Sequence, residues 1–209
     1  MAKKLIITIA RQFGSGGREI GERVAEILGI PCYDKELIKD AAAQGNLNAD
    51  VLKTTDESAA NSLLYTLAMG SNYLSAGARF GFNMPLNDKL FILQSDIIKE
   101  YAKAGSCVII GRCADYVLEG EADLLRIFVY GDAESRAKRI TERYPDIKST
   151  QVMDVINKTD KRRASYYNFY TGNKWGAHEN YDLSISSSTF GVEASARMIA
   201  DFAKGLMEG

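Results

Sequence analysis

Glycines and arginines gather in one short stretch near the start of the chain, LIITIARQFGSGGREIG at residues 5–21. Its apolar first part, residues 5–10, is rich in β-branched side chains and predicts a buried strand. Gly14-Ser15-Gly16-Gly17 follows, and glycines let a ligand approach the backbone closely. Residues 18–28 then place apolar side chains on one helical face, and Gly29 ends that helix. A strand, a glycine loop and a helix N-terminus in this order predict a phosphate-binding site.

The first interpretation of the loop is a P-loop, although the pattern G-x-x-x-x-G-K-[ST] is not satisfied. Without a gap, Arg11 stands at the first glycine and Gly17 at the lysine. Glu19 stands where a nucleoside-monophosphate kinase has its hydroxyl residue. A shift of one residue puts Arg18 at the lysine position instead.

The second interpretation is a dinucleotide-binding turn with the pattern G-x-G-x-x-G. Gly14 and Gly16 satisfy it, but Glu19 occupies the third glycine position. Asp34 lies about where the ribose-binding acid of such proteins falls. A third interpretation is a tight turn without a ligand. Four small residues in a row exceed what a turn needs, so the sequence favours ligand binding.

Length and composition predict one globular domain with an inserted subdomain, because 209 residues with 46% hydrophobic side chains can bury a large core. The net charge of −1 provides no field that attracts nucleic acid or membranes, so we expect neither as a partner. Three cysteines without metal-site spacing favour free thiols in a reducing cytoplasm. The sequence is compatible with a homodimer but does not predict one.

Strand and helix signals alternate along the whole chain. The predicted strands cover residues 5–10, 30–34, 107–110, 124–130 and 181–186. The predicted helices cover residues 18–28, 35–43, 88–103 (capped by Asn87), about 150–167 and 192–207, with one more that begins at Asp132 or Glu134. The central apolar runs lack the alternation of half-exposed strands. This order predicts a three-layer α/β/α sandwich with a mostly parallel five-stranded sheet.

Basic residues follow several of these strands. Gly111 and Arg112 follow the strand at 107–110, and the carboxyl end of a central strand faces the ligand crevice of α/β proteins. Two later helices carry basic clusters: Arg136, Lys138, Arg139 and Arg143, then Lys161, Arg162 and Arg163. Phosphoryl transfer depends mostly on positioning and charge neutralisation, and arginines supply both.

Six segments share their order and spacing with a known family. They are residues 7–21 (ITIARQFGSGGREIG), 33–37 (YDKEL), 108–112 (VIIGR), 126–129 with 134–139 (RIFV, ESRAKR), 160–167 and 181–183 (YDL). Together they resemble the cytidylate-kinase-like branch of the nucleoside-monophosphate kinases, which have the P-loop NTPase fold. The resemblance implies one kinase-like domain over residues 1–209, an acceptor-binding insertion at about 35–105, and a mobile lid at about 144–175.

The resemblance also implies roles for single residues. The arginine that contacts the acceptor phosphate corresponds to Arg112, although Cys113 replaces the aspartate that follows it in cytidylate kinases. Asp160 and Arg163 keep the spacing of the lid motif, whereas Ile156 replaces a further lid arginine. Arg139 matches the basic helix that leads into the lid.

We therefore expect an ATP- and Mg²⁺-dependent phosphotransferase that acts on a small phosphorylated acceptor, a nucleoside monophosphate. The expected nucleotide-binding residues are Gly14, Ser15, Gly16, Gly17, Arg18, Glu19 and Arg139. The expected catalytic residues are Arg18, Arg136, Arg162 and Arg163. The expected acceptor-binding residues are Asp34, Arg112 and Asp160. Glu19 is the expected Mg²⁺ ligand.

Two other functions compete with this one. A nucleotide-binding regulatory module without catalysis would explain the missing P-loop lysine and hydroxyl. A Rossmann-type reductase would explain the spacing of the first two glycines, but the missing third glycine and the basic lid-like helix count against it.

Overall fold

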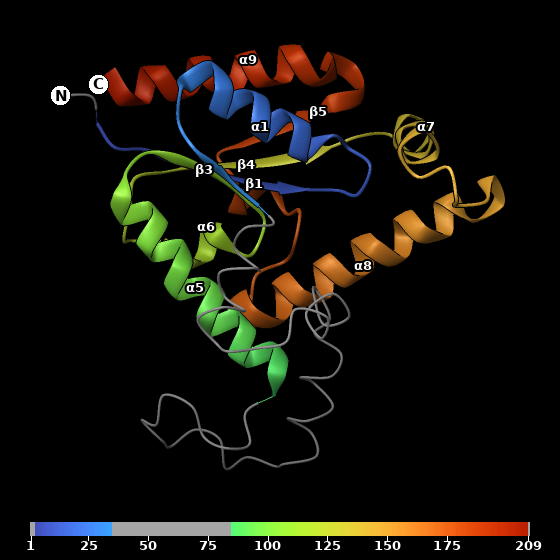
Figure 1. The fold of residues 1–209 in the computed structure, drawn as a ribbon, viewed down its shortest axis with the longest axis horizontal. Helices are drawn as coiled ribbons and strands as arrows, with labels where there is room; N and C mark the ends of the chain where they lie inside the picture. Colours follow the sequence, from blue (N-terminus) through green and yellow to red (C-terminus); the bar gives the residue numbers. More distant parts are fainter. Residues whose placement is uncertain (1–2, 35–84, 209) are drawn as a thin grey trace.

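The computed structural model describes residues 3–34 and 85–208, and their strands form a five-stranded, entirely parallel sheet in the order β2-β3-β1-β4-β5 (Figure 1). The strands are β1 Ile6–Arg11, β2 Cys32–Tyr33, β3 Cys107–Ile110, β4 Leu124–Tyr130 and β5 Leu183–Ser186. The helices are α1 Gly17–Leu28, α5 Leu86–Ala104, α6 Ala114–Val117, α7 Ala133–Arg143, α8 Val152–Thr171 and α9 Ser187–Glu208. Two 3₁₀ turns, η2 Ser149–Gln151 and η3 His178–Asn180, join them.

Helices cover both faces of the sheet, which gives the predicted three layers. Helices α1 and α9 lie side by side on one face, and α5 and α6 lie on the other (Figure 1). Successive side chains of β1 alternate between these faces. Ile7 and Ile9 join the core beneath α1 and α9, whereas Ile6 joins the core beneath α5. Helix α8 runs from α7 toward the lower end of α5 (Figure 1).

Strand β1 is the centre of the sheet, because it pairs with β3 on one side and with β4 on the other. Ile9 is in register with Ile110 of β3, and Arg11 is in register with Val129 of β4. The loops that follow these strands therefore leave the sheet at one edge. This edge, beside the central strand, is where doubly wound sheets bind ligands.

Some predicted boundaries were wrong. Helix α5 begins at Leu86, so Asn87 lies inside it and is not its cap; the cap position is Pro85. Strand β2 is shorter than predicted, and α9 begins at Ser187 with a kink at Gly191, where φ is 71°. The predicted helix at 35–43 lies outside the described residues, as does most of the insertion at 35–105.

The ends of the described chain meet beside α9, where the Lys3 amide donates a hydrogen bond of 3.0 Å to the Met207 carbonyl. Cys32, Cys107 and Cys113 are free thiols, as predicted. Within residues 3–34 and 85–208, no helix combines the length and apolar character that crossing a bilayer requires.

Candidate phosphoryl-transfer site

The glycine loop connects β1 to α1 and presents bare backbone. Gly14 and Gly16 have φ values of 80° and 77°, which lie in the left-handed region that glycine adopts most easily. Ser15 is buried and its hydroxyl donates to the Gln12 carbonyl at 2.9 Å, so its side chain turns back into the loop. The N-cap residue of α1 is Gly16, which has no side chain to cap the first turn. The N–H groups of that turn are therefore available to an anion.

A buried ion pair holds this loop from below. Asp160 of α8 accepts a hydrogen bond of 2.7 Å from the Phe13 amide, and Arg136 Nε of α7 donates one of 2.8 Å to the Phe13 carbonyl. Arg136 and Asp160 also pair with each other. Their side chains are only 10% and 17% exposed. The peptide groups on both sides of Phe13 are thus fixed to the two helices that follow β4.

The first pocket lies directly above the loop and is strongly basic. Among the described residues, its lining includes five arginines and one carboxylate, Glu19; the arginines are Arg11, Arg18, Arg139, Arg143 and Arg163. Glu19 pairs with Arg143 and, at 3.3 Å, with Arg139. Arg139 also covers Gly16, since an ideal Cβ on Gly16 would lie 2.9 Å from Arg139 Nη1. The excess positive charge matches a polyphosphate.

The second pocket opens at the carboxyl end of β3. Its floor is a left-handed turn in which Gly111, Arg112 and Cys113 have φ values of 72°, 61° and 54°. This conformation costs a non-glycine residue about 1–3 kcal/mol, and such strain concentrates at functional sites. Its wall contains the aromatic side chains of Tyr166, Tyr167 and Trp175. Arginine and aromatic groups together suit a ligand that has an anionic group and a planar ring.

A buried carboxyl group completes the second pocket. Asp115 of α6 accepts a hydrogen bond of 2.7 Å from the Tyr167 hydroxyl. Burial raises the pKa of Asp115, and the hydrogen bond from Tyr167 opposes this shift in part. Burial and the neighbouring Asp115 raise the pKa of Tyr167 well above its usual range. The Tyr167 hydroxyl therefore stays protonated and can continue to donate.

The two pockets meet at Arg11 and Arg163, which line both of them. Arg163 Nη1 donates a hydrogen bond of 3.0 Å to the Arg11 carbonyl, and its guanidinium lies 5.5 Å from the centre of the Phe13 ring. The first pocket faces the glycine loop and the second faces the turn after β3. The side chains of Arg11 and Arg163 therefore lie between the pocket at the glycine loop and the pocket at the turn after β3.

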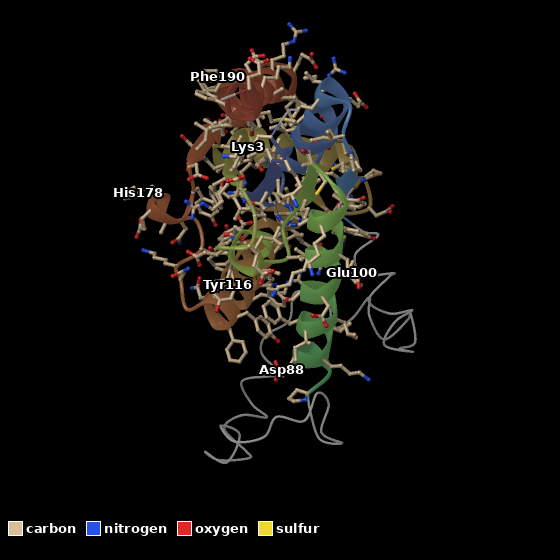
Figure 2. All side chains as sticks on the ribbon, turned by 90° about the vertical axis from the view of Figure 1, so that its left-hand side faces the viewer. Lys3, Asp88, Glu100, Tyr116, His178 and Phe190 are labelled. Atoms are coloured by element: carbon tan, nitrogen blue, oxygen red, sulfur yellow. The ribbon has the colours of Figure 1, made fainter. Side chains whose placement is uncertain are left out.

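Helix α8 is anchored along its second half on the other side of the site. Tyr170 stacks on Phe91 of α5 with ring centres 4.1 Å apart, and its hydroxyl donates to Asp88 at 2.8 Å. Asp88 lies at the lower end of α5 (Figure 2). Together with the contacts of Tyr167 and Arg163, these interactions tie α8 to three different elements.

The structure brings most, but not all, of the predicted site residues together. Arg112, which is expected from the sequence to bind the acceptor, lines the second pocket. Asp160 lies against the glycine loop and not in the second pocket. Arg162 is exposed on α8, where its Nη2 lies 3.3 Å from the Thr159 hydroxyl. Arg18 pairs with Asp34 at the end of β2 and not with Glu22, the alternative that helical spacing offers.

Sequence reasoning missed several residues of the two pockets, among them Arg11, Asp115, Arg143 and Tyr167. The sequence does contain a clue to Arg11, because this residue stands at the first glycine position of the P-loop pattern. It also contains one to Asp115, because this is an acidic residue two positions after Cys113, which replaces an acid. Arg143 and Tyr167 had no signal that separates them from ordinary helix-surface residues.

Comparison with known proteins places this geometry in a family. A model of the cytidylate kinase-like family matches residues 6–189, which include both pockets. The chain belongs to this family. No curated protein matches the sequence. Membership of the cytidylate kinase-like family supports a phosphotransferase.

Solved structures agree on the fold. An uncharacterized protein from Eubacterium ventriosum ATCC 27560 is 26% identical, with a TM-score of 0.68 over 95% of this chain and 98% of that chain. Shikimate kinase from Bacteroides thetaiotaomicron is 12% identical, with a TM-score of 0.55 over 96% and 98% of the two chains. Shikimate kinase from Acinetobacter baumannii in complex with shikimate is 11% identical, with a TM-score of 0.51 over 97% and 94%. This member of the cytidylate kinase-like family thus has the P-loop kinase fold.

Proposed function

We propose that the protein is an ATP-dependent kinase of a small phosphorylated acceptor, with a nucleoside monophosphate as our most specific proposal. The observation that carries it is the pair of adjacent basic pockets that share Arg11 and Arg163. In the proposed reaction, an acceptor phosphate oxygen bonds to the γ-phosphorus of ATP while the bond to the β–γ bridging oxygen breaks. ADP leaves with the electron pair of that bond.

The first pocket is the proposed ATP-phosphate site. The amides of the loop from Gly14 to Gly17 and of the first turn of α1 would receive the phosphate oxygens. Arg139 and Arg143 lie above the loop, and Glu19 is their counter-ion. A polyphosphate would replace this carboxylate as the partner of both guanidinium groups.

Mg²⁺ fits this site only as an ion that the nucleotide brings with it. Among residues 3–34 and 85–208, no group of three or more potential metal ligands is present. Mg²⁺ in kinases commonly uses one or two carboxylates, with phosphates and water for the remaining positions. We propose Glu19 as that carboxylate. The ion would neutralise charge on the β- and γ-phosphates.

The second pocket is the proposed acceptor site. Arg112 would bind the acceptor phosphate, and Tyr166 and Trp175 would contact a planar base. Asp115 and Tyr167 offer a carboxyl and a hydroxyl group to polar atoms of the same ligand. Phosphate plus ring is the chemistry of a nucleoside monophosphate.

The nucleotide-binding module without catalysis is the second candidate, and one observation favours it. Carboxylates already pair with the basic residues of the first pocket, because Asp34 pairs with Arg18, and Glu19 with Arg139 and Arg143. A site that only senses nucleotide could exchange these ion pairs for phosphate contacts without transferring a group. Formation of ADP separates the two functions.

The lid proposed for residues 144–175 is held differently in its two halves. The hydrogen bonds of α8 to Phe13, Arg11 and Asp115 come from Asp160 and later residues, whereas Val152 and Ile156 in its first half belong to an apolar cluster with Ile140 of α7. We expect residues 144–158 to close over bound nucleotide. Hydrogen exchange should slow there when an ATP analogue with Mg²⁺ is added, whereas exchange in α9 stays the same. Unchanged exchange throughout 144–158 would contradict a closing lid.

The decisive experiment mixes the protein with ATP, Mg²⁺ and a panel of monophosphates and measures ADP. Transfer to one nucleoside monophosphate supports the proposal, and ATP binding without ADP formation supports the module. Gly16→Val is the matched variant, because a side chain there meets Arg139 in a left-handed backbone. We expect it to lower ATP affinity at least about tenfold, the effect of losing one good contact. Gly205→Val, in open space on α9, is the control.

A further inference from the structure

We propose that Arg11 supplies the positive charge that a lysine supplies in other P-loops. This proposal rests on the first pocket being an ATP site. It concerns the chemistry of two positions that depart from the P-loop pattern together: Arg11, where a glycine is expected, and Gly17, where the lysine is expected.

The side chain of Arg11 occupies the space in which a side chain at position 17 would begin. An ideal Cβ built on Gly17 would lie 2.5 Å from Arg11 Cβ and 2.9 Å from Arg11 Cγ. Real Cβ atoms do not approach other atoms this closely, so a side chain at position 11 requires glycine at position 17. The two departures are therefore linked: this loop carries a long cationic side chain at its start, where the P-loop pattern carries one at its end.

The Arg11 side chain ends between the two pockets. An ideal Cβ on Gly111 would clash with Arg11 Nη1 and lie 3.1 Å from its Cζ, so the guanidinium covers the start of the turn after β3. Its Nη2 lies 4.0 Å from Asp34 Oδ1. The Arg11 side chain is only 13% exposed, and its carbonyl accepts the hydrogen bond from Arg163. The hydrogen bond from Arg163 holds the backbone of Arg11, and its side chain points toward Gly111 and Asp34.

The other basic residues of the loop fit this role less well. Arg18, the choice from sequence, lines the first pocket but not the second. It pairs with Asp34, which also faces Arg11. Arg18 therefore acts as a positioning residue, since it holds the carboxylate that orients Arg11. Arg139 and Arg143 share Glu19 and also line the first pocket alone.

An arginine at this junction has a chemical consequence. A lysine ammonium is a point charge, whereas a guanidinium presents a planar fork that can bind two oxygens at once. From its place between the pockets, Arg11 can contact a γ-phosphate oxygen and an acceptor phosphate oxygen together. We infer that it both binds the donor and aligns the acceptor.

The test compares four proteins by calorimetric affinity for ATP with Mg²⁺ and for ADP, by kcat, and by melting temperature. Arg11→Met keeps the stem that packs on Gly17 and removes the charge. It should weaken ATP binding at least about tenfold and weaken ADP binding less, because the lost partner is the γ-phosphate. It should lower kcat by about 10²-fold or more, the usual effect of losing one charge-stabilising donor.

Two further variants make the result specific. Arg11→Gly combined with Gly17→Lys rebuilds the usual P-loop pattern, and it should restore most of the ATP affinity that Arg11→Met loses. Arg23→Met removes a partly exposed arginine of α1 that pairs with Glu26 and Glu193 and lines neither pocket, so it should change nothing except local stability.

Each outcome of these measurements either supports or overturns the proposed role of Arg11. A folded Arg11→Met protein with parental ATP affinity and parental kcat overturns the proposal, and so does an equal loss of ATP and ADP affinity. If the parent binds ATP but no acceptor is phosphorylated, the kinase function fails. The role of Arg11 is then still decided by the difference between ATP and ADP affinity. A parent that binds no ATP overturns both.

Discussion

Arg163→Met should lower kcat for phosphoryl transfer by at least about 10²-fold, as expected when a preorganised cationic donor is lost. The reason is its place, since Arg163 is one of the two arginines that line both pockets. It also holds the Arg11 carbonyl at 3.0 Å and lies over the Phe13 ring. Removing it takes one charge from the junction and loosens the backbone that carries the other.

The neighbours of Arg163 on α8 make this prediction specific. Lys161→Met removes the same charge from an exposed position two residues away and should leave kcat within about twofold, as for surface substitutions away from the site. Arg162→Met tests whether Arg162 is catalytic, as expected from the sequence, or is an exposed residue outside the pockets, as in the structure. A small effect agrees with its exposed position, whereas a loss as large as that of Arg163→Met would support the catalytic role expected for Arg162 from the sequence. Parental kcat in a folded Arg163→Met protein would contradict the assignment.

The fold could be predicted from sequence because its signals are local. The apolar runs that became β3 and β4 have the predicted limits, Cys107–Ile110 and Leu124–Tyr130. Buried parallel strands need unbroken apolar residues, and such runs are easy to see. The start of α5 was missed because Asn87 is a residue type that often caps helices. The cap position is in fact Pro85, and proline is common where helices begin.

The site was only partly predictable, because its pairings join distant parts of the chain. Helical spacing offers Glu22 as the partner of Arg18, and no local rule points to Asp34, which follows strand β2. Similarly, the spacing of Asp160 and Arg163 agrees with a lid motif but does not reveal that one binds the Phe13 amide and the other the Arg11 carbonyl. Each of these contacts depends on the order of strands in the sheet.

The link between Arg11 and Gly17 shows why a motif test alone misjudges this loop. The P-loop pattern is matched one position at a time, so Arg11 and Gly17 count as two separate mismatches. In three dimensions the two positions touch, because β1 ends where α1 begins, and a side chain at one of them fills the space of the other. What such a loop requires is a cation above bare amides, and this requirement does not fix the residue that carries the cation.

The largest expected loss of stability follows from Asp160→Ala. This change leaves Arg136 as a buried guanidinium without its carboxylate and leaves the Phe13 amide without its acceptor. Removing one partner of a buried ion pair costs ~3–5 kcal/mol, because the other charge stays desolvated. The Arg136 side chain is 10% exposed, so we expect a loss of about 3 kcal/mol, near the lower end of that range. Urea unfolding, followed by circular dichroism, measures it.

Two companion variants identify the cause of this loss. Asp154→Ala removes an exposed acid from the first turn of the same helix and should cost at most ~1 kcal/mol, the scale of a helix-dipole contact. Asp160→Asn keeps an oxygen for the Phe13 amide and removes only the charge. Its loss in free energy of unfolding should therefore fall between the losses for Asp154→Ala and Asp160→Ala. Because the pair holds the loop on both sides of Phe13, ATP affinity should fall in the same order as stability. If Asp160→Ala were no less stable than Asp154→Ala, the buried pair would not be what fixes the loop.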